Sequence, residues 1–305
     1  MAANRTMNMP DTPEVRSDAG ETVMEGKLPE TMSAFVAGGY LNGTSATMPT
    51  ALPVTGRDHF DGYFLAAGIE KEAGSHGEVG ISFSYSDIGA TPAYVLNQAK
   101  SQLYEGTLYG KIENGRGFVA QAMLSAGSFN SQTVRNVSLV GTNYRLTTDD
   151  RSLIVAGEVS FGQDFDLGSL KVGPRVAFRA TSIMFDDINE QGGGPALTYY
   201  RDSYDSLQGR LGLHLSGGKT VKPYFSAYAV HELDSQPGLV AANFTGAIGP
   251  TALFAVAGTD KDWAEVSGGL SYSTGKVEIS VGADSTIWRT DVANQSYHGT
   301  VKFSF

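Results

Sequence analysis

The side chains that could carry out acid–base or metal chemistry lie scattered along this sequence, without the spacing that such chemistry needs. The five histidines follow no metal-ligand pattern; they are His59, His76, His214, His231 and His298. His231 precedes Glu232, but the second histidine of a helical zinc motif is missing. The chain contains no cysteine, which excludes thiolate catalysis, cysteine-based metal sites and disulfides.

Two loop-like segments carry polar groups that resemble binding loops only in part. Residues 186–190 hold several carboxylates, but their spacing differs from that of a calcium loop. Residues 192–194 are three glycines without the following Lys-Ser/Thr of a phosphate loop. No Gly-x-Ser-x-Gly elbow is present. We therefore expect no catalytic residue, no cofactor and no metal site, and we predict that the chain is not an enzyme.

Composition narrows the class of protein further. The 305 residues include 22 Lys and Arg against 32 Asp and Glu, and the formal charge of −10 argues against nucleic-acid binding. Mean hydropathy is −0.15, and no stretch approaches the roughly 20 apolar residues of a membrane-spanning helix. The first residues lack the apolar core of a signal peptide. Export would therefore require that the sequence continue a longer precursor.

The strongest signal is an alternation with a period of two. In the last twelve residues, Tyr297, Val301, Phe303 and Phe305 share one face with Gly299. Serine, histidine, threonine and lysine occupy the other face. Because side chains alternate across a strand, this segment is a ribbon with one apolar and one polar side.

The same alternation recurs along the chain in twelve segments. The cleanest six are 79–86, 152–161, 170–179, 207–216, 277–287 and 294–305. The less regular six are 33–43, 60–72, 102–113, 117–128, 221–233 and 262–273. Residues 1–31 are rich in Pro, Gly and acidic groups, and we interpret them as a flexible linker or passenger remnant. We assign residues 32–305 to one β-barrel domain.

The connections between these segments are of two kinds. Short turns rich in Gly and charge alternate with long polar connections, with a brief exception at 290–293. The long connections are 43–57, 87–100, 130–150, 186–202 and 234–261, and in the last of these 240–244 and 252–256 suggest a hairpin. Short periplasmic turns with longer extracellular loops are typical of outer-membrane barrels. The sequence therefore predicts an all-β, closed, antiparallel, 12-stranded transmembrane β-barrel in the outer membrane of a Gram-negative cell.

In such a barrel the polar face of each strand lines the lumen. The candidates for lumen-facing polar residues are Glu158, Arg175, Arg179, Arg210, His214, Glu278 and Asp284. This mixed-charge wall would hold water and could hydrogen-bond a polar linker. Aromatic residues near predicted strand ends fit an interfacial girdle, with some of them facing inward; they are Tyr63, Tyr85, Tyr104, Trp263 and Trp288.

In its final hundred residues above all, the chain resembles the autotransporter β-domain, the translocator domain of type V secretion proteins. The resemblance rests on the order and spacing of the segments 205–213 (DSLQGRLGL), 222–232 (KPYFSAYAVHE), 242–246 (ANFTG), 257–263 (AGTDKDW) and the closing KFSF. The segments 35–40 (FVAGGY) and 192–196 (GGGPA) are similar to barrels attached to subtilisin-like passengers.

The resemblance implies a monomeric barrel that anchors a covalently linked N-terminal passenger and mediates its export to the surface. It also implies folding by the outer-membrane assembly machinery, with a recognition signal carried by Tyr297, Val301, Phe303 and Phe305. The family usually threads a linker helix through the pore, whereas residues 1–31 are too rich in Pro and Gly for a long helix. Two alternatives stay open: a porin-like solute channel with the same fold, and a soluble β-rich adhesion module.

Overall fold

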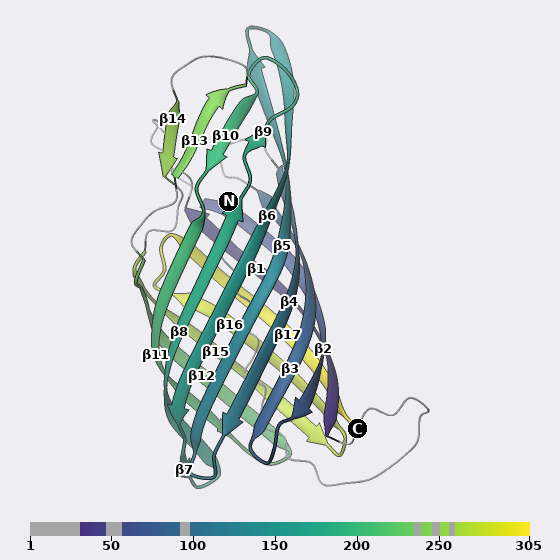
Figure 1. Ribbon diagram of the computed structural model, residues 1–305, viewed down its shortest axis with the longest axis vertical. Coiled ribbons are helices and arrows are strands. Elements are labelled where there is room, and N and C mark those ends of the chain that lie inside the picture. Colours follow the sequence, from purple (N-terminus) through teal and green to yellow (C-terminus); the bar gives the residue numbers. More distant parts are fainter. Residues whose placement is uncertain (1–30, 47–56, 92–97, 235–238, 246–250, 256–259) are drawn as a thin grey trace.

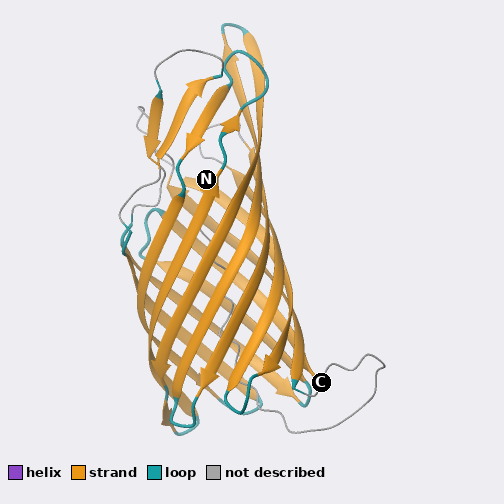
Figure 2. Ribbon diagram, in the orientation of Figure 1, coloured by secondary structure: helices purple, strands orange, loops and turns teal. Residues whose placement is uncertain are grey.

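A computed structural model describes residues 31–46, 57–91, 98–234, 239–245, 251–255 and 260–305. The described part consists of seventeen β-strands joined by turns and loops (Figure 2). Its residues include no helix with the length and hydropathy that crossing a membrane requires. The predicted linker 1–31 lies, except for Thr31, outside the described residues.

Twelve strands form one closed antiparallel sheet. They are β1 (Met32–Ala46), β2 (Arg57–Glu72), β3 (Gly77–Thr91), β4 (Gln98–Glu113), β5 (Phe118–Leu139), β6 (Thr142–Gln163), β8 (Leu170–Phe185), β11 (Tyr204–Gly217), β12 (Val221–Glu232), β15 (Asp262–Thr274), β16 (Val277–Ile287) and β17 (Val292–Ser304). Each pairs with its neighbours in this order, and β1 pairs with β17 to close the barrel. The short β7 (Phe165–Leu167) pairs only with β8 among the described strands. The predicted fold class and strand count are confirmed.

The two ends of the barrel differ, as Figure 1 shows. At the end that we call the short-turn end, successive strands are joined by brief turns, and both Met32 and Phe305 lie there with the Phe305 N–H donating to the Met32 carbonyl at 3.1 Å. At the opposite, long-loop end, the connections from β8 to β11 and from β12 to β15 are long and contain strands of their own.

Those additional strands form a module beyond the barrel rim. These four strands are β9 (Ile188–Asn189), β10 (Leu197–Arg201), β13 (Leu239–Phe244) and β14 (Ala252–Ala255), and they make a separate sheet in the order β14, β13, β10, β9. The outer halves of β5 and β6 stand beside this sheet and join it through a bridge between Thr147 and Gln191. We call this assembly, together with residues 131–150, the outer module. The hairpin suggested within 234–261 is present, as β13 paired with β14.

The prediction that 130–150 is a polar loop is wrong. These residues continue β5 and β6 as a paired ribbon that ends in the two-residue turn Val140–Gly141. Both turn residues have positive φ, at 46° and 79°, which is the conformation that a tight hairpin turn needs. The segment 186–202, also expected to be a loop, contains β9 and β10.

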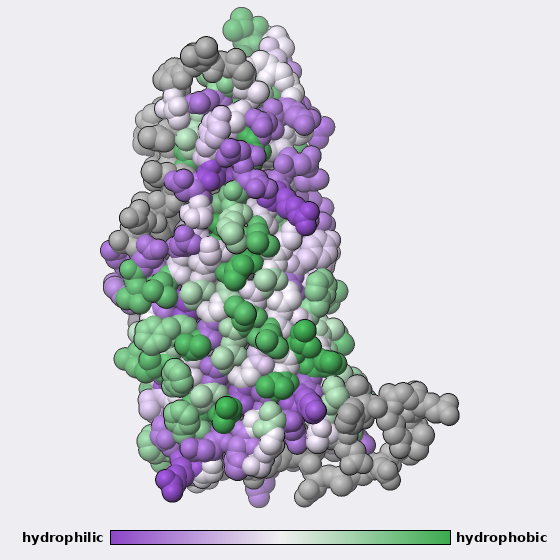
Figure 3. Space-filling view, viewed as in Figure 1, coloured by the Kyte–Doolittle hydropathy of each residue, from purple (hydrophilic) through white to green (hydrophobic). Residues whose placement is uncertain are grey.

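Burial in the barrel is the reverse of that in a water-soluble protein. Apolar side chains on the outer face are exposed, among them Val36, Leu65, Ile81, Phe83, Leu108, Leu124, Leu211, Leu213 and Val281. Charged and hydroxyl side chains on the inner face are buried. Figure 3 shows apolar residues gathered on the barrel wall and hydrophilic ones above it. A closed sheet leaves no unpaired edge, which is what a hydrocarbon environment requires.

Of the five aromatic residues considered for the girdle, four lie on the outer face of this wall or at its rim and one lies on the inner face. Tyr63, Tyr85 and Tyr104 lie on the outer face of β2, β3 and β4, where their rings are 6.3 and 5.1 Å apart. Trp288 is highly exposed, but Trp263 is buried on the inner face. Trp263 therefore does not belong to the girdle, because its position in β15 has the inward parity of Glu265.

Candidate functional site

The inner wall of the barrel is the candidate site, because the alternation within each strand directs its charged residues there. Strand register places all seven predicted lumen candidates on the inward parity of their strands. Arg175, Arg179, Arg210, His214 and Glu278 are buried. Glu158 and Asp284 are half-buried.

Four of the inward charges form one ionic cluster, which we call the wall cluster: Glu158, Arg179, Arg210 and Glu265. Arg210 donates from Nη1 to both oxygens of Glu158 at 3.0 Å and from Nη2 to Glu265 Oε2 at 2.5 Å. Arg179 Nε donates to Glu158 Oε2 at 2.7 Å. Two positive and two negative charges therefore compensate each other.

Aromatic residues complete the wall cluster. The Arg210 guanidinium lies 4.4 Å from the centre of the Tyr228 ring. Trp263 Nε1 donates to Glu265 Oε1 at 3.2 Å. The cluster thus joins β6, β8, β11, β12 and β15 across the inner wall. Removing one charge from such a network leaves its partners buried and uncompensated, which costs more than the intact pair contributes.

The remaining candidates pair separately. Arg175 binds Asp164 at 2.6 Å, at the short-turn end. His298 Nδ1 lies 3.3 Å from Asp284 Oδ2. His214 Nδ1 lies 3.0 Å from Ser226 Oγ. These residues therefore do not form a common constellation with the wall cluster.

A second cluster crosses the place where the barrel closes, and we call it the seam cluster: Ser33, Glu70, Glu78, Tyr109 and Lys302. The Lys302 ammonium contacts Glu70 and lies 2.8 Å from Glu78 Oε1. Tyr109 donates to Glu70 at 2.7 Å, and Ser33 donates to it at 3.1 Å. Glu70 is 2 % exposed, and its partners come from four other strands.

The predicted recognition residues of the final strand lie on the outer face. Tyr297, Phe303 and Phe305 are exposed, and Val301 is half-buried. Register pairs Tyr297 with Tyr40, Val301 with Val36 and Phe303 with Ala34 of β1. A partner that approached from the membrane side could contact all four.

Sequence reasoning missed Glu265 and the pairing of Lys302 with carboxylates of β2 and β3. Glu265 lies in a Gly-rich strand whose apolar alternation is weak, so its inward parity was not evident. Lys302 stood on the polar face of the last strand, but its carboxylate partners are more than two hundred residues earlier in the chain. Barrel closure, which no local pattern shows, brings them together.

The outer module has an ionic centre of its own. Arg135 holds Glu190 through two hydrogen bonds of 2.9 and 2.5 Å. Tyr199 donates to Glu190 Oε1 at 3.2 Å. Burial, together with the adjacent Glu190 carboxylate, raises the pKa of Tyr199 to about 12. The hydrogen bond to Glu190 outweighs burial and raises the pKa of Arg135.

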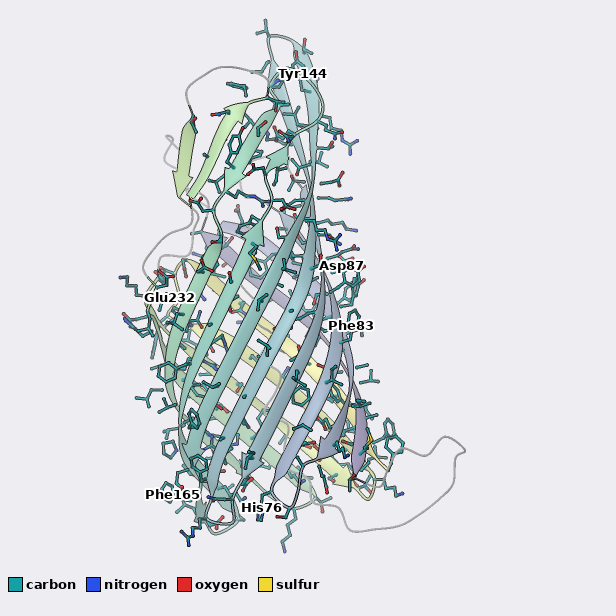
Figure 4. The ribbon with its side chains drawn as sticks, in the orientation of Figure 1. His76, Phe83, Asp87, Tyr144, Phe165 and Glu232 are labelled. Carbon is teal, nitrogen blue, oxygen red and sulfur yellow. The ribbon has the colours of Figure 1, made fainter. Side chains whose placement is uncertain are left out.

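Figure 4 shows how these regions are arranged along the molecule. His76 and Phe165 lie at the short-turn end, and Tyr144 lies at the far end of the outer module. Phe83 and Asp87 follow one another up the wall, with the carboxylate nearer the long-loop rim. Among the described residues, no three His, Asp or Glu gather closely enough to hold a metal ion. The inner wall can pair with charges and hydrogen-bond a polar chain.

One protein-family model matches most of the chain. The model of the autotransporter β-domain family matches residues 53–284, which is well over half of the chain. No curated protein sequence matches the chain significantly.

Three solved structures share the fold. The translocator domain of the autotransporter NalP from Neisseria meningitidis is similar with a TM-score of 0.69 and 12% identity, covering 90% of this chain and 89% of that one. The β-domain of the Bordetella autotransporter BrkA has a TM-score of 0.62 and 15% identity, covering 90% and 99%. The transport unit of AIDA-I from Escherichia coli has a TM-score of 0.56 and 12% identity, covering 93% of both.

Proposed function

The chain belongs to the autotransporter β-domain family, and from this premise we propose that its lumen wall holds the segment that connects the barrel to an exported passenger. The protein is an outer-membrane translocator barrel that serves passenger export. The proposal concerns the path of the connecting segment, the orientation of the barrel and the residues that the process uses.

The observation that carries the proposal is the position of Met32. β1 begins at the short-turn end, next to Phe305. We assign this end to the periplasm, because short periplasmic turns and longer outer loops are the usual asymmetry of such barrels. The chain then enters β1 from the periplasmic side. A passenger at the cell surface therefore requires that the segment before Met32 cross the membrane.

The lumen offers the polar route for this crossing. Its wall carries charges of both signs, and the wall cluster compensates its own charges internally. A polar, Pro- and Gly-rich segment can exchange hydrogen bonds with such a wall without leaving an unpaired charge in hydrocarbon. A barrel of twelve strands lies between the filled interior of about eight strands and the open channel of about sixteen. It would admit an extended segment but no folded domain.

Cysteine crosslinking tests the path, because the chain has no cysteine of its own. Single cysteines placed along residues 1–31 are combined with Ser226→Cys, on the inner face of β12, or with Ala227→Cys, on its outer face. We expect oxidation to link the upstream segment to position 226 and not to position 227. Links to neither position, or to both equally, would refute passage through the lumen.

The same preparation separates the proposal from its rival, a porin-like solute channel. A lumen that holds the upstream segment conducts ions poorly, and deletion of residues 1–31 would raise the conductance in planar bilayers. Steady, high conductance of the full chain would favour the channel instead.

We also propose that the outer face of β17 is read by the barrel assembly machinery and that the folded barrel acts as a monomer. Phe303 is exposed to the membrane side, whereas its neighbour Ser304 has the opposite parity. Phe303→Ser should lower the amount of folded barrel in the outer membrane, and Ser304→Ala should leave it unchanged. Equal amounts for both variants would remove Phe303 from the recognition signal.

A further inference from the structure

At the contact between β1 and β17, where the sheet closes, side chains reach across β1 at both of its ends. At the short-turn end, Lys302 of β17 binds Glu70 of β2 and Glu78 of β3 on the inner face. β1 lies between β17 and β2. Lys302 therefore contacts strands that are two and three positions away around the barrel, and these contacts form only when the sheet is closed.

At the long-loop end, Arg57 makes a corresponding bridge in the opposite direction. Arg57 is the first residue of β2, and its Nε donates to Thr44 Oγ1 of β1 at 2.8 Å. Its Nη1 donates to the Thr290 carbonyl, and its Nη2 lies 3.4 Å from the Asp291 carbonyl, both in the turn between β16 and β17. Arg57 thus connects β2 to the turn before β17 past the end of β1.

The turn that receives Arg57 is held in place from a second side. Asp260 accepts hydrogen bonds from the backbone and hydroxyl of Thr290 and from the Asp291 N–H. Burial alone would raise the pKa of Asp260, but these hydrogen bonds outweigh it and lower the pKa below its usual value. Asp260 and Arg57 therefore hold the same turn, one through its N–H groups and the other through its carbonyls.

Between these two bridges, one cross-strand pair on the lipid face of the seam has no side chains. Gly38 of β1 and Gly299 of β17 are direct partners on the outward parity. Cross-strand side-chain pairs are the main source of stability between neighbouring strands beyond the backbone. At the middle of the seam this contribution is missing.

We propose that Lys302 and Arg57 form a two-ended lock that keeps the β1–β17 seam closed. The lock goes beyond passenger export, because it concerns how the translocating barrel stays intact. Lys302 acts from the inner face at one end and Arg57 from the outer face at the other, so separation of β1 from β17 must break both.

The test uses a disulfide across the seam in the full-length, otherwise cysteine-free chain. Ala37 and Thr300 are direct partners across the seam, and Ala66 and Ser84 are direct partners between β2 and β3. Both pairs face inward. Hydrogen-bonded and non-hydrogen-bonded pairs alternate along an antiparallel ladder. Ala37–Thr300 lies an odd number of positions from the hydrogen-bonded pair Met32–Phe305, and Ala66–Ser84 lies an odd number of positions from Ala73–Gly77. Both are therefore non-hydrogen-bonded pairs, the closely spaced kind that a disulfide can join.

The measurement is the temperature at which the detergent-extracted barrel loses its compact, heat-modifiable form in electrophoresis. We expect Lys302→Met and Arg57→Gln each to lower this midpoint by about 5–10 °C, because each leaves buried or fixed partners unsatisfied. Lys171→Met is the control, since Lys171 of β8 donates to Glu113 of β4 at 3.2 Å, on strands away from the seam. Its effect should be less than half as large.

The disulfides then separate a seam lock from general stabilisation. The Ala37→Cys/Thr300→Cys disulfide should restore the midpoint of both variants under oxidising conditions, and the Ala66→Cys/Ser84→Cys disulfide should not. If Lys302→Met does not fold, the Arg57→Gln comparison decides alone. Equal rescue by both disulfides, no rescue by the seam disulfide, or an equal loss in Lys171→Met would overturn the proposal. None of these outcomes depends on passenger export, so the two proposals can fail separately.

Discussion

The barrel wall and the outer module follow opposite burial rules within one chain. On the wall, Leu211 is 63 % exposed while its neighbour Arg210 is 6 % exposed. In the outer module, Leu146 is completely buried and Ala242 is nearly so. A sheet whose apolar residues face outward is stable only in hydrocarbon, whereas apolar residues that face inward indicate water outside. The change of rule along β6 thus marks where the membrane ends.

The two regions also use charge differently. The wall cluster places two arginines and two carboxylates on an inner surface, where they compensate each other. The outer module uses the Arg135–Glu190 pair to hold a loop against a hairpin. The first arrangement lines the lumen, and the second holds residues 190–195 against the β5–β6 hairpin. Four experiments test this contrast.

The largest effect is expected inside the barrel. Arg210→Met removes the cation that binds both Glu158 and Glu265, leaving two half-buried carboxylates with Arg179 alone. We expect a loss of about 3–5 kcal/mol in the free energy of unfolding, measured by urea titration in lipid vesicles. Arg151→Gln, which removes one hydrogen bond to Ser128 at an exposed position, is the control. Equal losses would show that the wall cluster contributes no more to the free energy of unfolding than one exposed hydrogen bond.

The next effect comes from the outer face of the same strand. Leu211→Arg places a charge against hydrocarbon and should cost about 2–4 kcal/mol in the same titration. Leu139→Arg, at the tip of the outer hairpin, should cost almost nothing, although Leu139 is also an exposed leucine. If both positions tolerate arginine equally, the barrel wall does not face lipid.

A smaller and more local effect is expected in the outer module. Leu146→Ala empties a fully buried site and should cost about 2–3 kcal/mol, confined to the module. Limited proteolysis on intact cells should then cut near the β5–β6 hairpin, while the heat-modifiable mobility of the barrel stays as it was. A fall in barrel stability by the same amount would show that the two regions unfold together.

The smallest effect is the pH dependence of the module. Because the pKa of Tyr199 is raised to about 12 in the folded protein and is about 10 in an unfolded chain, its neutral form is favoured by folding. Its contribution to stability is complete below about pH 10 and is lost as the pH rises toward 12. Tyr199→Phe should remove this step from a pH series of proteolysis rates. An unchanged step would assign the transition to another group.

How far the sequence predicted the fold follows from the same contrast. All twelve barrel strands were predicted, because lipid on one side and a polar lumen on the other impose a strict alternation. The outer half of the β5–β6 hairpin was missed, since its residues alternate polar with polar: Thr133 faces Thr148 and Ser131 faces Asp150. Where a hairpin has no regular apolar face, its sequence resembles that of a loop.

The candidate site was predicted in the same uneven way. Arg179, Arg210 and Glu158 were found because their strands alternate cleanly, but Glu265 was hidden by the glycines Gly268 and Gly269 that follow it. The partners of Lys302 depend on closure of the whole sheet, and a single sequence carries no local sign of that. Parity within a strand was predictable, but pairing across the barrel was not.

The meeting of β1 and β17 also sets an order of events during biosynthesis. β17 follows every other barrel strand along the polypeptide, so ribosomes complete it after all of its neighbours. No sealed cylinder can exist until then, and whatever precedes β1 has already been made. On the route that we propose through the lumen, that earlier material waits in the periplasm, unfolded enough to enter a narrow pore, until β17 has been made.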